Sequence, residues 1–545
     1  MVFLQIVAAA AVYVAYRVVW SYIENRRFEQ FAEQHGCQKA RDLTEGWLAS
    51  FRKIRRMLSV KKSGEDFIDD IFAVDFEDVS TVQRKGFEGS MMLTTLEPAN
   101  LQAFLATQFD EFETGKQRYL QLAPILGRSI FTSDGAFWAH SRALFRPQFS
   151  RDNINDLEAT EKAAKALVTA VGPANSTGWT RNVDLSPMFF NFTLDTASEF
   201  LFGESAESQA AMMAAENGQD SGAVGGAQFR RDFELVGEQL ISRIRLFSLY
   251  WMSDSFEFRR AAGRVKAFTE KYVQAALNTT NTGKIEGKKE TLLSRLATET
   301  RNAEELSTYS SSVILTSRTV PHNLVVTPQA SVHPNFPEIK RNGHTIPNDF
   351  TGNQTLAILF AGRDTTASLL GWSFLRLSIH PEVVEKLRSV ILSDFPDDQP
   401  ITFAALKDCR YLRHFINEVL RLHPTVPLNG RTAIKNTTLP VGGGPDEKSP
   451  VAIRKGQAIG FSVYLMHRRK DLWGEDALEF KPERWEQKIP AWQFLPFLGG
   501  PRVCIGQQFA LVEASYLIVR LLQRYDKIEP VDTALMKKGR KGLGL

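Results

Sequence analysis

Residues 497–506 of this 545-residue chain read Phe-Leu-Gly-Gly-Pro-Arg-Val-Cys-Ile-Gly. The glycines of this stretch let the backbone bend and approach a flat ligand closely. Cys504 lies just before the apolar stretch 507–525, and the unpaired N–H groups at the start of that predicted helix should lower the pKa of its thiol. Arg502 can pair with an acidic group of the same ligand. A lone cysteine is more often buried and inert, but the whole pattern favours a thiolate that binds a flat, acidic cofactor.

A second polar pattern, Ala361-Gly362-Arg363-Asp364-Thr365-Thr366, interrupts an apolar helical stretch. Gly362 has no side chain, so a ligand could lie in the groove that it leaves against the helix. An acid beside hydroxyl groups can transfer protons. From these residues alone, a polar turn that faces solvent is an equally good alternative.

Glu418 and Arg421 lie one turn apart in the predicted helix 408–422. Alone, such a pair is nearly always exposed and contributes little. Its importance comes from the stretch Phe-Lys-Pro-Glu-Arg-Trp at 480–485, which contains Arg484 and precedes the cysteine stretch.

Trp138 and Arg142 are also one helical turn apart, so an indole N–H and a guanidinium point to the same side. These donors suit two anionic groups on one ligand. A core tryptophan beside a surface arginine is the alternative interpretation.

Together these stretches resemble the motifs of the cytochrome P450 family, in the family's order, over roughly residues 90–530. The cysteine stretch matches every fixed position of its haem-binding loop, FxxGxRxCxG. The other three match its oxygen-binding helix (AGxDT), its ExxR and PERF-like motifs, and its WxxxR helix. Trp485 stands where the family usually has Phe.

The resemblance implies a mainly α-helical fold with a smaller β-rich portion, and haem b (iron protoporphyrin IX) as cofactor. Cys504 is then the axial ligand of the haem iron. The other cofactor-binding residues that it implies are Trp138, Arg142, Arg431, Phe497, Arg502 and Gly506. Asp364 and Thr365 are expected to deliver protons during catalysis. Glu418, Arg421 and Arg484 are expected to form a buried structural triad.

The resemblance further implies a monooxygenase that hydroxylates C–H bonds with O2. Its electrons would come from NADPH through NADPH–cytochrome P450 reductase, with cytochrome b5 as a second candidate donor. The stretches 127–149 and 428–444 look like those of fungal n-alkane and fatty-acid hydroxylases. We therefore expect oxidation of long-chain alkanes or fatty acids at the terminal (ω) carbon. Apolar residues such as Leu356, Ile358, Phe360 and Val426 are expected to line the pocket. Sterols, terpenes or xenobiotics stay open as substrates, as does a haem-binding protein with impaired activity.

The amino terminus is mostly apolar for 23 residues, and about 20 such residues span the hydrocarbon core of a bilayer. We predict a transmembrane anchor over 1–23, a basic membrane-proximal linker over 24–62 and a catalytic domain over 63–545. Arg17 lies near the end of the apolar run and Arg26 and Arg27 follow it, which favours a cytosolic catalytic domain. The resemblance places it at the endoplasmic reticulum membrane. A helix lying on the membrane surface is the alternative.

The remaining composition limits other functions. Three widely spaced cysteines form no disulfide framework, which indicates a reducing compartment. The net charge of +4 and the absence of a binding motif do not indicate a nucleic-acid partner.

Three stretches depart from the expected pattern. Residues 205–228 are rich in Ala, Gly and Ser and predict a surface loop. Residues 307–348 form an atypical Pro-rich insertion where the family has helix, so the oxygen-binding helix should begin near Asp349. Residues 536–545 form an atypical tail in place of a β-hairpin, and we hypothesise that these last two stretches derive from retained introns or a gene-model error.

Overall fold

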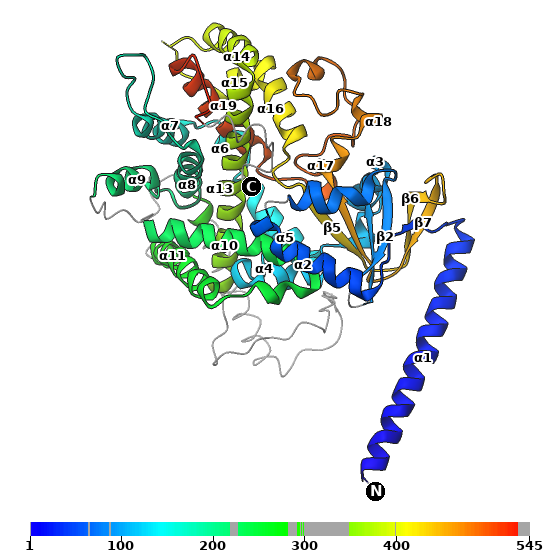
Figure 1. Cartoon of the computed structure of the whole chain (residues 1–545). Coiled ribbons are helices and arrows are strands. Elements are labelled where there is room, and N and C mark those ends of the chain that lie inside the picture. Colours follow the sequence, from blue (N-terminus) through cyan, green and yellow to red (C-terminus); the bar gives the residue numbers. More distant parts are fainter. Residues whose placement is uncertain are drawn as a thin grey trace, which may run out of the picture.

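A computed structural model describes residues 2–63, 66–86, 89–218, 227–281, 291–294, 296, 298, 348–397 and 399–531. The predicted fold class is confirmed, because helices make up most of the body and the strands gather on one side (Figure 1). The atypical tail and, except for its last residue, the Pro-rich insertion lie outside the described residues.

The larger helices are α1 (Val2–Gln34), α2 (Trp47–Ser63), α4 (Lys116–Leu126), α5 (Gly135–Phe145), α7 (Glu158–Val171), α8 (Leu185–Phe202), α9 (Ser208–Glu216), α10 (Ala227–Arg245), α11 (Phe256–Asn281), α13 (Asn348–Ile379), α14 (Pro381–Asp394), α16 (Arg410–Leu422) and α19 (Gln507–Arg524). Short helices and turns are α3 (Pro98–Gln102), α6 (Arg151–Ile154), α15 (Phe403–Asp408), α17 (Val463–Met466), α18 (Lys470–Trp473), η1 (Phe67–Phe72), η2 (Ala73–Phe76), η3 (Ala103–Thr107), η4 (Phe109–Glu111), η5 (Phe247–Ser253), η6 (Pro482–Glu486) and η7 (Gly500–Arg502).

The β-rich portion combines strands from the early and the late part of the chain. Its larger sheet has the order β1-β2-β3-β8-β5-β4, and β6 pairs with β7 in a separate hairpin. The strands are β1 (Arg41–Asp42), β2 (Thr81–Lys85), β3 (Met91–Thr95), β4 (Phe112–Glu113), β5 (Leu428–Ala433), β6 (Thr437–Gly443), β7 (Ser449–Ile453) and β8 (Ala458–Ser462). The parallel pair β3–β8, with Leu93 opposite Ile459, fixes the early part of the chain against the late part.

Helix α13 is the central rod of the helical portion (Figure 1). It packs against α8, α11, α16 and α19, which are far apart in the sequence. Leu370 and Leu377 of α13, Phe415 of α16 and Leu517 of α19 are fully buried in one apolar cluster. Each such side chain contributes about 1.5–3 kcal/mol on burial, so this core holds the helices that carry the candidate residues.

The predicted surface loop at 205–228 is wrong in its first half, where α9 forms. Ser208 and Gln209 begin this helix, and their backbone N–H groups donate to the Asp195 carboxylate of α8 at 2.6 and 3.2 Å. An acid from another helix thus stabilises the helix start, a tertiary contact that local composition does not reveal. Residues 219–226 lie outside the described part of the chain.

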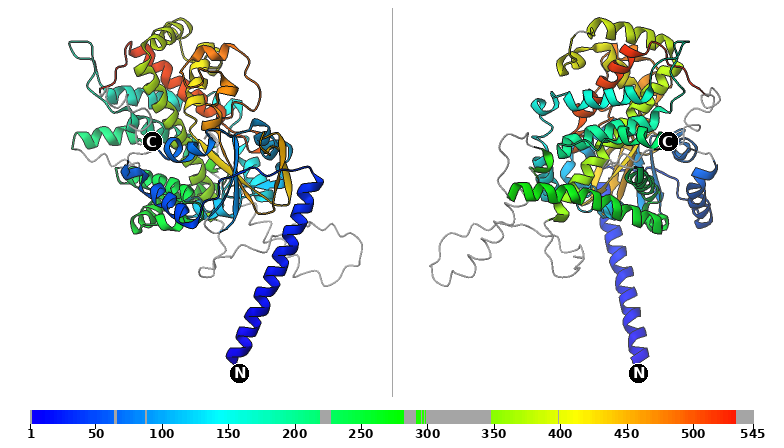
Figure 2. Two further views of the ribbon diagram at one scale, coloured as in Figure 1. Left: turned by 45° about the vertical axis from the view of Figure 1, so that its right-hand side comes forward. Right: turned by 90° about the vertical axis from the view of Figure 1, so that its left-hand side faces the viewer.

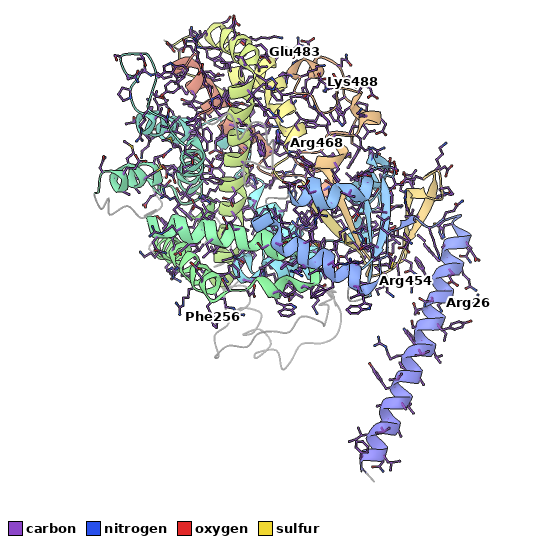
Figure 3. All side chains as sticks on the ribbon, in the orientation of Figure 1. Arg26, Phe256, Arg454, Arg468, Glu483 and Lys488 are labelled. Carbon is purple, nitrogen blue, oxygen red and sulfur yellow. The ribbon has the colours of Figure 1, made fainter. Side chains whose placement is uncertain are left out.

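Helix α1 projects from the body and continues past residue 23 to Gln34 (Figure 2). It is the one helix in the described part of the chain that is long and apolar enough to cross a membrane. At its inner end, the Arg454 guanidinium lies 4.4 Å from the Phe28 ring and donates to Asn25 at 2.7 Å (Figure 3). The basic run of the predicted linker lies largely in helix α2.

Glu513 is a buried acid of the central core. It lies on α19, and the Thr196 hydroxyl of α8 donates to its carboxyl group. Burial raises the pKa of Glu513 to about 8, against a lowering by Thr196 and Thr366. The folded chain therefore keeps this carboxyl protonated at neutral pH.

We predict that the free energy of unfolding of Glu513→Gln increases relative to that of the unmodified protein as the pH rises from 5 to 8. In this range Glu513 is ionised in the unfolded chain but protonated in the folded chain. The free energy of unfolding of the unmodified protein therefore falls by up to about 1.4 kcal/mol per pH unit, and that of the variant lacks this decrease. Urea denaturation of both proteins at pH 5, 6.5 and 8 measures the difference. A difference that does not change with pH would contradict the buried, neutral carboxyl.

Candidate active site

The Cys504 loop is held against the β-rich side of the molecule. The Cys504 N–H donates to the Phe497 carbonyl at 3.0 Å, which closes the loop just before α19. Gly500 has a φ of +68°, and a Cβ added there would lie 1.8 Å from the Leu105 carbonyl of η3. No side chain fits at position 500, so this glycine is required for the loop to sit where it does.

The Cys504 side chain is accessible, but the expected lowering of its pKa is wrong. Protein atoms surround the thiol and remove part of its hydration although the residue is exposed, and this desolvation raises the pKa of Cys504. The Gly506 N–H and the Arg142 guanidinium lower the pKa by less. The prediction considered only the amides at the helix start and not the desolvation around them. A coordinating metal deprotonates a thiol outright, so a role as ligand does not depend on this shift.

A cluster of arginines lies near the cysteine loop, and we call it the arginine cluster. Its members are Arg118 of α4, Arg142 of α5, Arg431 of β5 and Arg502 of η7. Asp134 is the acid that contacts it most directly, since Arg502 donates to its carboxylate at 2.6 Å. Positive charge therefore exceeds negative charge at the centre of this group.

The arginine cluster has spare capacity for an anionic ligand. Burial and the neighbouring Arg118 and Arg502 lower the pKa of Arg431 to about 9. The buried Arg431 Nε has no hydrogen-bond partner among the described residues. The Arg502 guanidinium lies 4.3 Å from the centre of the Trp138 ring, which fixes its plane. Carboxylates placed here would relieve the repulsion and satisfy the unpaired donor.

Arg118 was missed by sequence reasoning. It donates to Asn429 Oδ1 at 2.8 Å and to the Phe131 carbonyl at 2.9 Å, which places it beside β5 and its Arg431. Its local sequence, Lys-Gln-Arg-Tyr at 116–119, carries no motif. Only the pairing of distant segments brings it to the site.

The two residues expected to transfer protons lie side by side on α13 but have different partners. The Thr365 hydroxyl donates to the Ala361 carbonyl at 2.7 Å, one turn earlier. The Asp364 carboxylate accepts from Arg363 at 2.9 Å. Burial raises the pKa of Asp364, while Arg363 lowers it and Glu234 raises it further. An acid with a raised pKa keeps its proton to a higher pH than an ordinary carboxyl group, which suits a proton donor.

Glu418, Arg421 and Arg484 lie in contact. Arg421 forms two hydrogen bonds of 2.8 Å to the Glu418 carboxylate, and both side chains are completely buried. Arg484 Nε lies 3.5 Å from Glu418 and its Nη1 donates to Asp476 at 2.9 Å. The Arg484 and Lys481 side chains lower the pKa of Asp476 to about 2. Asp476 therefore belongs to this network, although no motif marked it.

Trp485 supplies a contact that phenylalanine cannot make. Its indole N–H donates to Glu418 Oε2 at 3.1 Å. The backbone N–H of Lys481 donates to the other oxygen of the same carboxylate at 2.9 Å. The departure from the family's usual Phe thus adds a hydrogen bond to the buried charge.

We predict that Trp485→Phe lowers the free energy of unfolding by about 1–3 kcal/mol, because a buried charged acceptor loses a donor. Urea denaturation measures the change. The control is Trp473→Phe, which removes an indole N–H without a partner among the described residues and keeps an aromatic ring beside the Arg421 guanidinium, 5.1 Å away. Unchanged stability of Trp485→Phe would show that the hydrogen bond contributes nothing.

Comparison with known proteins covers nearly the whole chain. A family model described as Cytochrome P450 matches residues 335–545. Cytochrome P450 monooxygenase g430 from a Fusarium species is 39% identical over 95% of this chain and 85% of its own length. Cytochrome P450 52A10 from Candida maltosa is 37% identical over 91% of this chain and 88% of its own length. Cytochrome P450 52A13 from Debaryomyces hansenii is 36% identical over 92% of this chain and 88% of its own length.

Proposed function

This chain belongs to the cytochrome P450 family and is a cytochrome P450 monooxygenase, and on this premise we propose that it hydroxylates long-chain alkanes or fatty acids at the terminal carbon. The single observation that carries the oxidative chemistry is an accessible Cys504 on a rigid loop beside the arginine cluster. The alkyl substrate rests on the resemblance of residues 127–149 and 428–444 to fungal alkane and fatty-acid hydroxylases.

The residues present fit the haem that the family implies. We propose Cys504 as the axial ligand, and the arginine cluster together with Trp138 as the site of the propionates. Phe497 and Gly506 shape the loop around the cysteine. When bound, the haem supplies the activation of O2, and the chain supplies a fixed thiol and fixed positive charge.

The proton-transfer roles of Asp364 and Thr365 remain part of the proposal. Desolvation by the surrounding protein raises the pKa of Asp364, although 37% of its side chain is exposed, and Thr365 is fixed by its bond to Ala361. In this proposal Asp364 holds the proton, and the Thr365 hydroxyl, the next residue along α13, is the second group through which it is delivered.

The apolar lining expected from the sequence needs correction. Leu356 and Ile358 are buried in the core beside residues of α10 and α11. The Phe360 ring stacks on Phe233 of α10 at 3.9 Å, whereas Val426 is exposed. The residues of α13 that face α10 therefore hold the helices together, and the substrate class does not rest on them.

The family implies a redox partner, and we propose NADPH–cytochrome P450 reductase, with cytochrome b5 as a second donor. We also propose that residues 1–23 anchor the chain in the endoplasmic reticulum membrane, with 24–62 next to the surface and 63–545 catalytic. The apolar side chains of α1 are exposed, and so are Trp47, Leu48 and Phe51 on the basic helix α2. Exposed apolar groups next to basic ones suit an anionic lipid surface.

We predict ω-hydroxylation of lauric acid and dodecane by the full-length protein reconstituted with the reductase, NADPH and lipid vesicles, because terminal oxidation of an alkyl chain is the proposed reaction. Gas chromatography of the products, compared with those from a sterol panel, measures substrate choice. Cys504→Ser serves as the inactive control. Turnover of sterols without turnover of either alkyl substrate would overturn the substrate class while leaving the haem site intact.

We predict that Arg118→Met accelerates haem loss roughly ten- to hundredfold, since a hydrogen bond to a charged group contributes about 1.5–3 kcal/mol. Transfer of haem to excess apomyoglobin, followed by absorbance, measures the rate. Arg128→Met is the matched control, because Arg128 is an exposed arginine whose guanidinium lies over the Phe137 ring. Equal rates for the two variants would remove Arg118 from the proposed propionate site.

A further inference from the structure

Arg363 is a buried cation inside the central helix, and its setting is unusual for a charged side chain. It is 1% exposed, and its guanidinium carbon lies 4.8 Å from both the Phe190 ring of α8 and the Phe233 ring of α10. The Thr193 hydroxyl of α8 donates to its backbone carbonyl at 2.9 Å. Two aromatic faces therefore hold the guanidinium in one plane.

Two carboxylates lie within reach of this one guanidinium. Arg363 Nη1 donates to Asp364 at 2.9 Å, whereas Nη2 lies 3.6 Å from the Glu234 carboxylate of α10. Nε and Nη2 of Arg363 make no hydrogen bond to any described residue. An arginine carries five N–H donors, so Arg363 keeps donors that a small approach of Glu234 would engage.

Helix α10 forms the wall on this side of Asp364. Gly237 follows Phe233 by four residues and Glu234 by three, so it lies next to both of them on the surface of α10. A Cβ added at Gly237 would lie 3.5 Å from Asp364 Oδ2, so the α10 backbone passes close to the carboxylate. The charged groups that act on Asp364 are Arg363 from its own helix and Glu234 from α10. From α8, the acid Asp195 is already bonded to Ser208.

We infer that Arg363 is a positioning residue that holds Asp364 and, through Glu234, couples the Asp364 carboxylate to the position of helix α10. This inference rests on the proposed proton-transfer role of Asp364. When α10 brings Glu234 closer, Arg363 divides its donors between two acids and its hold on Asp364 weakens. Asp364 then retains its proton more readily and can donate it. When α10 withdraws, Arg363 pairs with Asp364 alone and favours the carboxylate.

The test follows the protonation of Asp364 in the full-length, haem-loaded ferric protein without substrate or turnover. Infrared difference spectra recorded across a pH titration report the carboxyl band, and Asp364→Asn identifies that band by its disappearance. We expect Arg363→Gln to raise the titration midpoint, because a cation that stabilises the carboxylate is lost. We expect Glu234→Gln to lower it, because a competing anion is lost. Arg363→Lys keeps the charge and should restore part of the wild-type midpoint.

Glu238→Gln is the matched control, since it removes the same charge from an exposed position one turn further along α10. Glu234 is also largely exposed, with 47% of its side chain accessible, so its variant tests the inference even if the buried Arg363 variants fail to fold. A midpoint in Glu234→Gln equal to that of the unmodified protein would overturn the coupling. The titration needs no substrate, so failure to hydroxylate alkyl chains would leave this outcome readable.

Discussion

The fully buried Glu418 carboxylate is the constraint on which much of this structure depends. A charge without water must be paired and hydrogen-bonded. Glu418 meets that need with donors from Arg421, Trp485 and the backbone of Lys481. Arg421 in turn donates to the carbonyls of His467, Ala477 and Glu479. The network thereby fixes the long irregular segment that leads from the β-rich portion to the Cys504 loop, because no single strand or helix does so.

The opposite electrostatic situation occurs at the candidate cofactor site. Around Glu418 the positive and negative charges are paired, and their hydrogen bonds hold the surrounding segments in fixed positions. Around Arg431 cations exceed acids, and a buried donor stays unpaired. Such an arrangement costs stability by itself and is relieved by an anionic ligand. The charge-balanced network around Glu418 stabilises the scaffold, whereas the arginine cluster, with its excess of positive charge, is suited to bind an anionic ligand. Asp364 lies between these extremes, since one arginine is close to two acids.

The sequence predicted the family, the fold class and the contacts among Glu418, Arg421 and Arg484, because short motifs carry these features. It predicted less well where distant segments decide the outcome. Helix α9 forms because Asp195 of α8 caps it, and Arg118 joins its cluster only through the pairing of remote segments. The pKa of Cys504 rises because of surrounding protein that the helix-start argument did not include. Leu356 and Ile358 pack against other helices, so their apolar character alone did not reveal which way they face.

The close approach of Gly500 to the Leu105 carbonyl also orders the assembly of the chain in time. Leu105 leaves the ribosome well before Gly500, so the loop that docks on this surface emerges only after the long intervening chain. Segments that are synthesised first can begin to fold first. The surface around Leu105 therefore stays uncovered until the Gly500 loop has been made. A prosthetic group held in the proposed way, by Arg118 and Arg142 and by the Cys504 loop, could bind only after that loop has been synthesised.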